Sequence, residues 1–104
     1  MRIYPFTLLL GIWLMASNIA QADDEYELAD SRGCLACHQL DMKIVGPSFK
    51  EIARKYSGNN GAESILEDKV INGGVGVWGN MPMHAGNIDK EEAATLVKWI
   101  LGTK

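Results

Sequence analysis

Apolar residues recur at helical spacing in four stretches of the chain, and no stretch shows the sustained alternation of a β-strand. The clearest stretch follows Asp89, where Asp89 and Glu92 have the spacing of a capping box. Beyond it, apolar residues recur every three or four positions. These inward residues are Ala93, Leu96, Val97, Ile100 and Leu101. The pattern predicts an all-α fold with a C-terminal helix that packs on the core.

Two further helices are predicted in the first half. One covers about 24–37 and opens with acidic residues, which suit the positive end of a helix dipole. It places Leu28, Ser31 and Leu35 on one side. The second follows the break at Gly46-Pro47, with Ser48 as its N-cap. The residues expected on its inner face are Phe49, Ile52, Ala53 and Tyr56.

The remaining helix is predicted over 62–71, and Asn72-Gly73-Gly74 ends it. Its residues at helical spacing are Ile65, Leu66, Lys69 and Val70. The loop before it, 57–61, is rich in Gly and Asn. The stretch 75–87 contains several glycines and a proline, so we expect an ordered loop there.

The N-terminus has the pattern of a secretory signal, with Arg2, a largely apolar run over 3–15 and the small residues of Ala20-Gln21-Ala22. The alternative is a retained membrane anchor, but the apolar run is short for a span of about 20 residues. We therefore expect residues 1–22 to be removed after Ala22, on export to the periplasm. Residues 23–104 would then form a single domain, without stable membrane insertion.

A mature chain of 82 residues rarely folds on apolar packing alone, so a disulfide, a metal or a large cofactor is expected to stabilise it. Removing Arg2 leaves 9 basic and 13 acidic residues, a net charge of −4. Nucleic acid is an improbable partner for such a chain, because phosphate binding requires a basic face.

The sequence Cys34-Leu35-Ala36-Cys37-His38 is the attachment pattern of a c-type haem. Two thiols at a short fixed spacing add to the two vinyl groups on one edge of the haem. The histidine that follows is then brought under the ring, where an imidazole nitrogen binds the iron. The motif thus provides both a covalent anchor and a ligand.

Three other readings of these residues remain open. A disulfide between Cys34 and Cys37 would close a small ring and constrain little of the chain. A thioredoxin-like redox pair belongs beside a strand and helix unit, which the helical pattern lacks. A zinc site needs four ligands, and Cys34, Cys37, His38 and His84 are the only cysteines and histidines. Haem is favoured because it also supplies the missing stabilisation.

A sixth ligand would decide whether the iron is open to small molecules or closed. The chain has five methionines, and Met1 and Met15 leave with the signal. Met42 lies too near the histidine to reach the opposite face of the ring. Met81 and Met83 remain, although methionine also fills irregular apolar gaps.

The segments GCLACHQLDMKIVGPSFKEIARKYSG, VINGGVGVWGNMPM and EEAATLVKWILGTK resemble the short bacterial class I cytochromes c of the c-551 type. The resemblance covers nearly all of the mature chain. It implies a small class I cytochrome c fold, with about four helices and glycine-rich loops around one covalent haem c. It also implies axial ligands His38 and Met83, which leaves Met81 as a packing residue.

The resemblance assigns supporting roles around the haem. The carbonyl of Pro47 would accept a hydrogen bond from His38, and the ring nitrogen of Trp78 would reach a haem propionate. Lys69 stands where the family often has an arginine near that propionate. Lysine is a point donor rather than a planar fork, so a solvated position is the alternative for Lys69.

The sequence departs from the family pattern beside Met83. Some members have an asparagine three positions after the axial methionine, and it donates to the methionine sulfur. This chain has Gly86 at that position and Asn87 one position later. If that hydrogen bond is absent, the reduction potential should be lower. His84 is expected to be a partly exposed loop residue that competes for iron only if the loop opens.

The resemblance implies an electron-transfer protein rather than an enzyme, because an iron with histidine and methionine ligands has no vacant position. Implied partners are a quinol–cytochrome c reductase as donor and a terminal oxidase, nitrite reductase or cytochrome peroxidase as acceptor. A monomer is expected for a diffusing carrier. The alternatives are a haem-based sensor and a small peroxidase with His84 as its distal group. Both require a labile Met83.

Overall fold

The computed structural model describes residues 2, 3, 11 and 19–103. Four α-helices and one short 3₁₀ helix make up the described part. They are α1 (Ile19–Ser31), the 3₁₀ helix (Cys34–Ala36), α2 (Phe49–Lys55), α3 (Ala62–Asn72) and α4 (Lys90–Leu101). Outside the helices this part has isolated β-bridges and no named strand, which confirms the all-α prediction. Most of the predicted signal lies outside the described residues, and cleavage after Ala22 stays a prediction.

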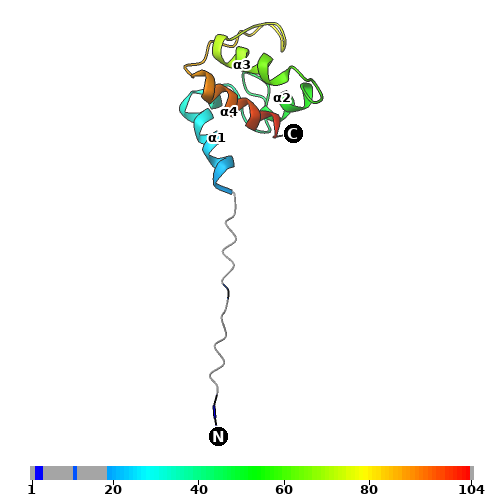
Figure 1. Cartoon of the computed structure of the whole chain (residues 1–104). Coiled ribbons are helices and arrows are strands. Elements are labelled where there is room, and N and C mark those ends of the chain that lie inside the picture. Colours follow the sequence, from blue (N-terminus) through cyan, green and yellow to red (C-terminus); the bar gives the residue numbers. More distant parts are fainter. Residues whose placement is uncertain (1, 4–10, 12–18, 104) are drawn as a thin grey trace.

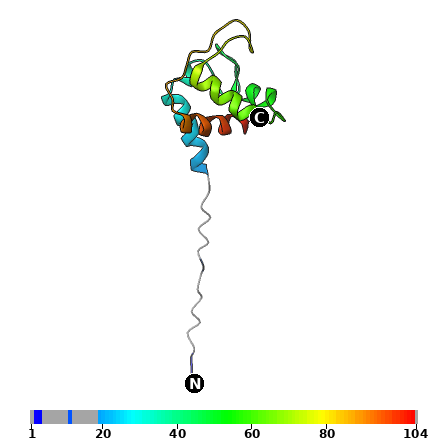
Figure 2. The ribbon, with the colours of Figure 1, turned by 45° about the horizontal axis from the view of Figure 1, so that its top comes forward.

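Helix α4 lies at the centre of the fold and packs against each of the other three α-helices (Figures 1 and 2). Its inner side buries Ala93, Leu96, Val97 and Ile100, as predicted, and Leu101 is half-buried. The capping box at its start is also confirmed, with Asp89 as N-cap and Glu92 as its partner. The other core residues come from α1, α2 and α3, and include Ala29, Phe49, Ile52 and Leu66.

The prediction of one helix over 24–37 is wrong at both ends. Helix α1 begins at Ile19, and no acidic residue lies in its first turn. Helix α1 stops at Ser31, because Gly33 takes the left-handed conformation, with φ of 79°, that a helix cannot continue through. A separate 3₁₀ turn follows. There the amide groups of Cys37 and His38 both donate to the carbonyl of Cys34, at 3.2 and 2.9 Å. This tight turn, rather than a continuous helix, carries the Cys-x-x-Cys-His motif.

Two residues that the helical spacing grouped with apolar neighbours are exposed. Ser31 lies at the surface, and its hydroxyl donates to the carbonyl of Leu28. Ile65 on α3 is 39% exposed, whereas Leu66 is buried. In α3 the residues that reach the core therefore form a narrower stripe than helical spacing alone indicates.

An ion pair joins the end of α1 to the start of α4. Arg32 donates from Nη2 to both carboxylate oxygens of Glu92, at 2.9 and 2.7 Å. This hydrogen bond to Glu92 raises the pKa of Arg32. Because Glu92 also closes the capping box of Asp89, one carboxylate holds two segments. The residues just before Cys34 are thereby held against α4.

We expect Ser48→Ala to lower the free energy of unfolding by about 1 kcal/mol, the usual cost of a lost N-cap. Ser48 is fully buried, and its hydroxyl accepts from the amide of Glu51 at 3.1 Å. Ser64→Ala is the control, because Ser64 is exposed on α3 and little change is expected there. Chemical denaturation of the two variants measures the difference, and equal stabilities would contradict the prediction.

Asp89 should give the fold part of its pH dependence. The Glu92 amide, which donates to this carboxylate, lowers the pKa of Asp89. A carboxyl with a lowered pKa in the folded state stabilises that state above its unfolded pKa, and the stabilisation is lost as the pH falls through the folded pKa. Asp89→Asn keeps a cap without this titration. It should therefore lose less stability than the wild type between about pH 5 and pH 2.

Asp89→Ala is the matched control, because it removes the cap and the charge together. We expect it to be less stable than Asp89→Asn already at neutral pH. Thermal unfolding over the pH series provides the measurement. If the wild type and Asp89→Asn lost the same stability as the pH falls, the titration of Asp89 would not contribute to the pH dependence of the fold.

Candidate haem site

A cavity of about 490 Å³ lies between the Cys-x-x-Cys-His turn, three of the helices and the loop that follows α3. Its volume is within the range of about 300–1,000 Å³ that is typical of cofactor sites. Apolar side chains form its inner wall, among them Ile52, Leu66, Val70, Leu96, Val97 and Ile100. Every site residue predicted from the sequence also lines it: Cys34, Cys37, His38, Pro47, Lys69, Trp78 and Met83.

His38 is oriented by a hydrogen bond to the backbone. Its Nδ1 lies 2.7 Å from the carbonyl oxygen of Pro47, which is buried. A carbonyl only accepts, so Nδ1 carries the hydrogen and donates it. The lone pair is then on Nε2, which is the arrangement of a histidine that binds a metal.

Two neighbours of the His38 ring were not recognised in the sequence. The ring of Phe49 stacks on the imidazole, with centroids 5.6 Å apart and planes at 24°. Gly46 approaches it so closely that an added Cβ would lie 2.6 Å from Cε1 of His38. Pro47 was expected to fix the direction of the imidazole, and Gly46, interpreted only as part of a break between helices, makes room for it.

The two cysteines lie on the same cavity as His38 and are not bonded to each other. Cys34 is half-buried, and this burial raises the pKa of its thiol, while Cys37 is exposed. Within the described residues, no three His, Cys, Asp or Glu side chains gather as a metal site would require, which disfavours zinc. A strand beside the motif, as in a thioredoxin-like unit, is also missing from the described part.

The loop over 73–88 is fastened to the end of α3 and extends beyond that helix (Figures 1 and 2). Gly74 and Met83 exchange backbone hydrogen bonds at 3.0 and 2.8 Å. The amide of Gly86 donates to the carbonyl of Val70 at 2.9 Å. These bonds hold Met83 at the cavity, where it is 37% exposed, whereas Met81 is 67% exposed.

The departure at Gly86 has a steric basis. A Cβ on Gly86 would lie 2.5 Å from the carbonyl oxygen of Val70, so an asparagine does not fit there without a backbone shift. Asn87 is exposed, although it borders the cavity. His84 is exposed on the same loop and also lines the cavity, as expected for a partly exposed loop residue.

One lysine lines the cavity, and a second contacts a residue of its lining. Lys69 is half-buried, and its Nζ would lie 3.0 Å from a Cβ on Gly74, so the side chain lies across the start of the loop. Lys55, which the sequence did not single out, places its ammonium 5.2 Å from the ring centroid of Trp78. This is a cation–π contact. It steadies an indole that is otherwise 43% exposed.

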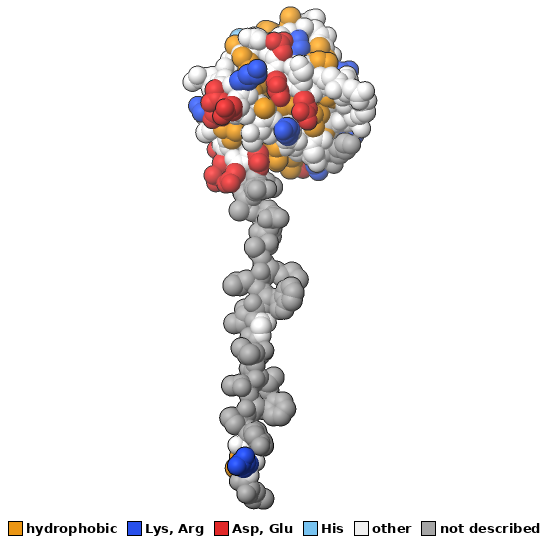
Figure 3. Space-filling model, viewed as in Figure 1, with side chains coloured by type: hydrophobic (Ala, Val, Ile, Leu, Met, Phe, Trp, Pro, Cys, Tyr) orange, Lys and Arg blue, Asp and Glu red, His pale blue; other side chains and the backbone are white. Residues whose placement is uncertain are grey.

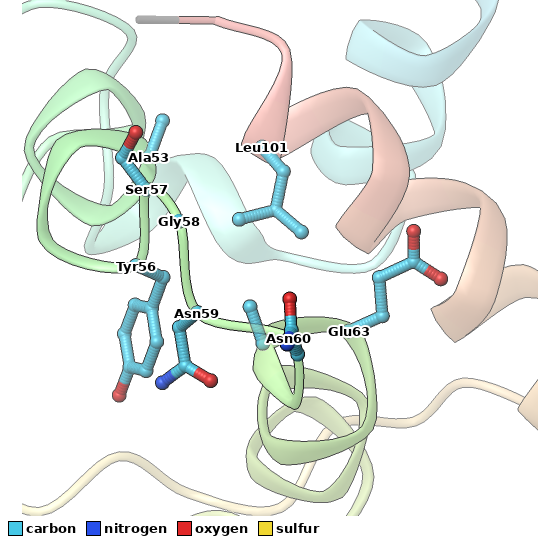
Figure 4. A pocket seen from close by; sticks show the side chains of 9 residues that line it. Ala53, Tyr56, Ser57, Gly58, Asn59, Asn60, Glu63 and Leu101 are labelled. Carbon is cyan, nitrogen blue, oxygen red and sulfur yellow. The ribbon is translucent and has the colours of Figure 1, made fainter.

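A second hollow, of about 290 Å³, lies between the end of α2, the 57–61 loop and Leu101 of α4 (Figure 4). Glycine, asparagine and serine supply much of its lining, and it contains no cysteine, histidine or methionine. The candidate haem chemistry is therefore confined to the larger cavity. No helix within the described residues is long and apolar enough to cross a membrane.

The chain belongs to the cytochrome c family, whose model matches residues 26–104. The fold is that of a small class I cytochrome c, and the cofactor is one covalently bound haem c. The chain's only two cysteines are those on the cavity. Family membership also indicates a role in electron transport.

Among relatives, the chain is similar to cytochrome c-551 of Pseudomonas aeruginosa, at 40% identity over 100% of both chains. It is 50% identical to cytochrome c2 of Rhodocyclus tenuis, over 78% of this chain and 94% of that one. The crystal structure of wild-type Nitrosomonas europaea cytochrome c552 superposes with a TM-score of 0.73 at 41% identity, covering 76% of this chain and 99% of that one.

A substitution at Gly73 tests how tightly the loop that contains Met83 is held. Gly73 and Gly58 both have a positive φ, of 76° and 77°, and Gly73 combines it with a ψ of −171°, a conformation almost restricted to glycine. An added Cβ at Gly58 meets nothing, whereas one at Gly73 would meet the carbonyl oxygen of Met83. Gly58→Ala should therefore cost only the backbone strain, about 1–2 kcal/mol, and Gly73→Ala distinctly more. Denaturation of the haem-loaded variants, with their absorption spectra, measures both effects, and equal costs would argue against a tightly held loop.

Proposed function

We propose that this chain is a periplasmic carrier of single electrons, with its haem attached to Cys34 and Cys37 and the iron bound by His38 and Met83. The observation that carries the proposal is that all four side chains border one cavity with an apolar wall. Three of them come from the turn after α1 and one from the loop after α3, so distant parts of the sequence meet at a single cavity.

His38 is suited to its role because its hydrogen bond to Pro47 leaves the lone pair of Nε2 free to bind the iron. The same hydrogen bond makes the imidazole a stronger ligand. The contacts with Gly46 and Phe49 restrict the ring to one direction. The chain's own contacts therefore set the direction of this ligand.

Met83 is favoured over Met81 by exposure and by the backbone. Met83 belongs to the bridge with Gly74 and is the less exposed of the two. A ligand held by its backbone loses little conformational freedom on binding, which favours a closed coordination sphere.

When bound, the haem iron supplies reversible one-electron chemistry. A methionine ligand raises the reduction potential relative to a second histidine, because thioether sulfur is a weak donor. The apolar wall acts in the same direction, since it disfavours extra positive charge. Trp78 and Lys69 are proposed to donate to the haem propionates, a role that their place on the cavity supports.

The proposed partner surface is the rim of the cavity beside Cys37. Exposed apolar residues lie on this rim, among them Val45, Val77 and Met81. Such a patch suits small and short-lived encounters. The proposed donor is a quinol–cytochrome c reductase, and the acceptor a terminal oxidase, nitrite reductase or cytochrome peroxidase. The predicted signal over 1–22 supports the periplasm, and a monomer fits a diffusing carrier.

Carbon monoxide distinguishes the carrier from a sensor or a peroxidase. We expect the reduced wild-type protein to bind little of it, because both axial positions are filled. Met83→Ala should bind it readily, and Met81→Ala should behave as the wild type. Spectral titration of the three proteins is the measurement. Ready binding by the wild type would instead favour a sensor or peroxidase.

A further inference from the structure

Four aromatic rings form a continuous line from His38 to the surface of the protein. The ring of Phe49 stacks on His38 at 5.6 Å between centroids, and Trp99 meets Phe49 at 5.4 Å. Tyr26 then meets Trp99 at 6.3 Å. Phe49 is 2% exposed and Tyr26 is 41% exposed, so the line runs from the core to solvent.

The line of rings leads away from the cofactor cavity. Tyr26 belongs to α1 and Trp99 to α4, and neither lines the cavity. All three centroid separations are those of rings in direct contact. Electron tunnelling weakens steeply across gaps between atoms, so rings in contact transmit it better than loosely packed aliphatic groups. Tyrosine and tryptophan are also the side chains most easily oxidised, whereas Phe49 can serve only as a bridge.

We propose that these rings form a second electron path, which connects the proximal ligand His38 with a redox partner at Tyr26. The inference rests on the proposed function, since His38 must bind the iron for the path to end there. One electron passes from a reduced one-electron carrier at Tyr26 to the oxidised cofactor, or in reverse. No bond forms or breaks and no proton moves, so the partner is oxidised as the protein is reduced. The first electron path remains the one through the rim of the cavity, where the proposed partner surface lies.

A covalent ruthenium label tests the path without a partner. The haem-loaded variant Tyr26→His carries a photo-oxidisable ruthenium–bipyridine complex on the new imidazole, at the end of the line of rings. Glu27→His is the matched control, because Glu27 is the exposed neighbour on the same helix and makes no ring contact with Trp99. Singly labelled protein is purified and the label located by peptide mapping, since His84 is also exposed. Flash photolysis then measures the transfer of one electron from the reduced haem to the oxidised ruthenium.

We expect transfer to the label at position 26 to be several-fold faster than to the label at 27. Adding Trp99→Leu should slow transfer from position 26 several-fold and leave position 27 nearly unchanged. Trp99→Phe keeps a ring and should restore most of the rate. Equal rates at the two positions, or no effect of Trp99→Leu, would overturn the path.

The reduction potential and unfolding midpoint of each variant are measured alongside. If Trp99→Leu unfolds, the comparison of positions 26 and 27 and the effect of Trp99→Phe still decide. Absorption spectra recorded before labelling separate the two proposals. Missing haem or an open iron would refute the proposed function, whereas normal spectra with equal rates would refute the path alone.

Discussion

The fold is built around a cavity that its own side chains do not fill. An empty volume of about 490 Å³, at about 24 cal/mol per Å³, would cost on the order of 10 kcal/mol if it were dry. This is as large as the whole stability of an ordinary domain. It is an upper limit, because rim residues such as Trp78 and Met81 are exposed and water can enter. A large apolar occupant would remove this cost, and the covalent haem of the family is such an occupant.

The helices are arranged so that the chain defines both sides of this occupant. On one side, Gly33 ends α1 and starts the turn that presents Cys34, Cys37 and His38. The ion pair between Arg32 and Glu92 holds that turn against α4. On the other side, the loop that contains Met83 is fastened to the last turn of α3. Charged residues of both signs are dispersed over the face seen in Figure 3.

Much of the helical fold and of the haem motif was predictable from the sequence, because the relevant signals are local. The apolar spacing after Asp89 and the cap at Ser48 depend on neighbours a few residues away, and both elements formed as expected. The haem motif is equally local, since its spacing is set by the cofactor. The error in α1 had a local cause as well: Gly33 was read as part of a helix, although glycine favours the left-handed conformation that ends one.

The features that escaped prediction involve contacts between distant segments. The stacking of Phe49 on His38 depends on where α2 crosses the motif. The need for Gly86 depends on the carbonyl of Val70, which another element supplies. Apolar spacing alone could not reveal either contact, nor the contact of Tyr26 with Trp99, because spacing describes one helix at a time.

The most direct test of the central claim is the absorption spectrum of the oxidised, haem-loaded protein in the far red, where sulfur ligation of haem iron produces a weak band. The account predicts that the band is present in the wild type, persists in Met81→Ala and disappears in Met83→Ala. A wild-type protein without the band, or a band that survives Met83→Ala, would contradict the assignment of the ligand and the closed site on which the carrier function depends.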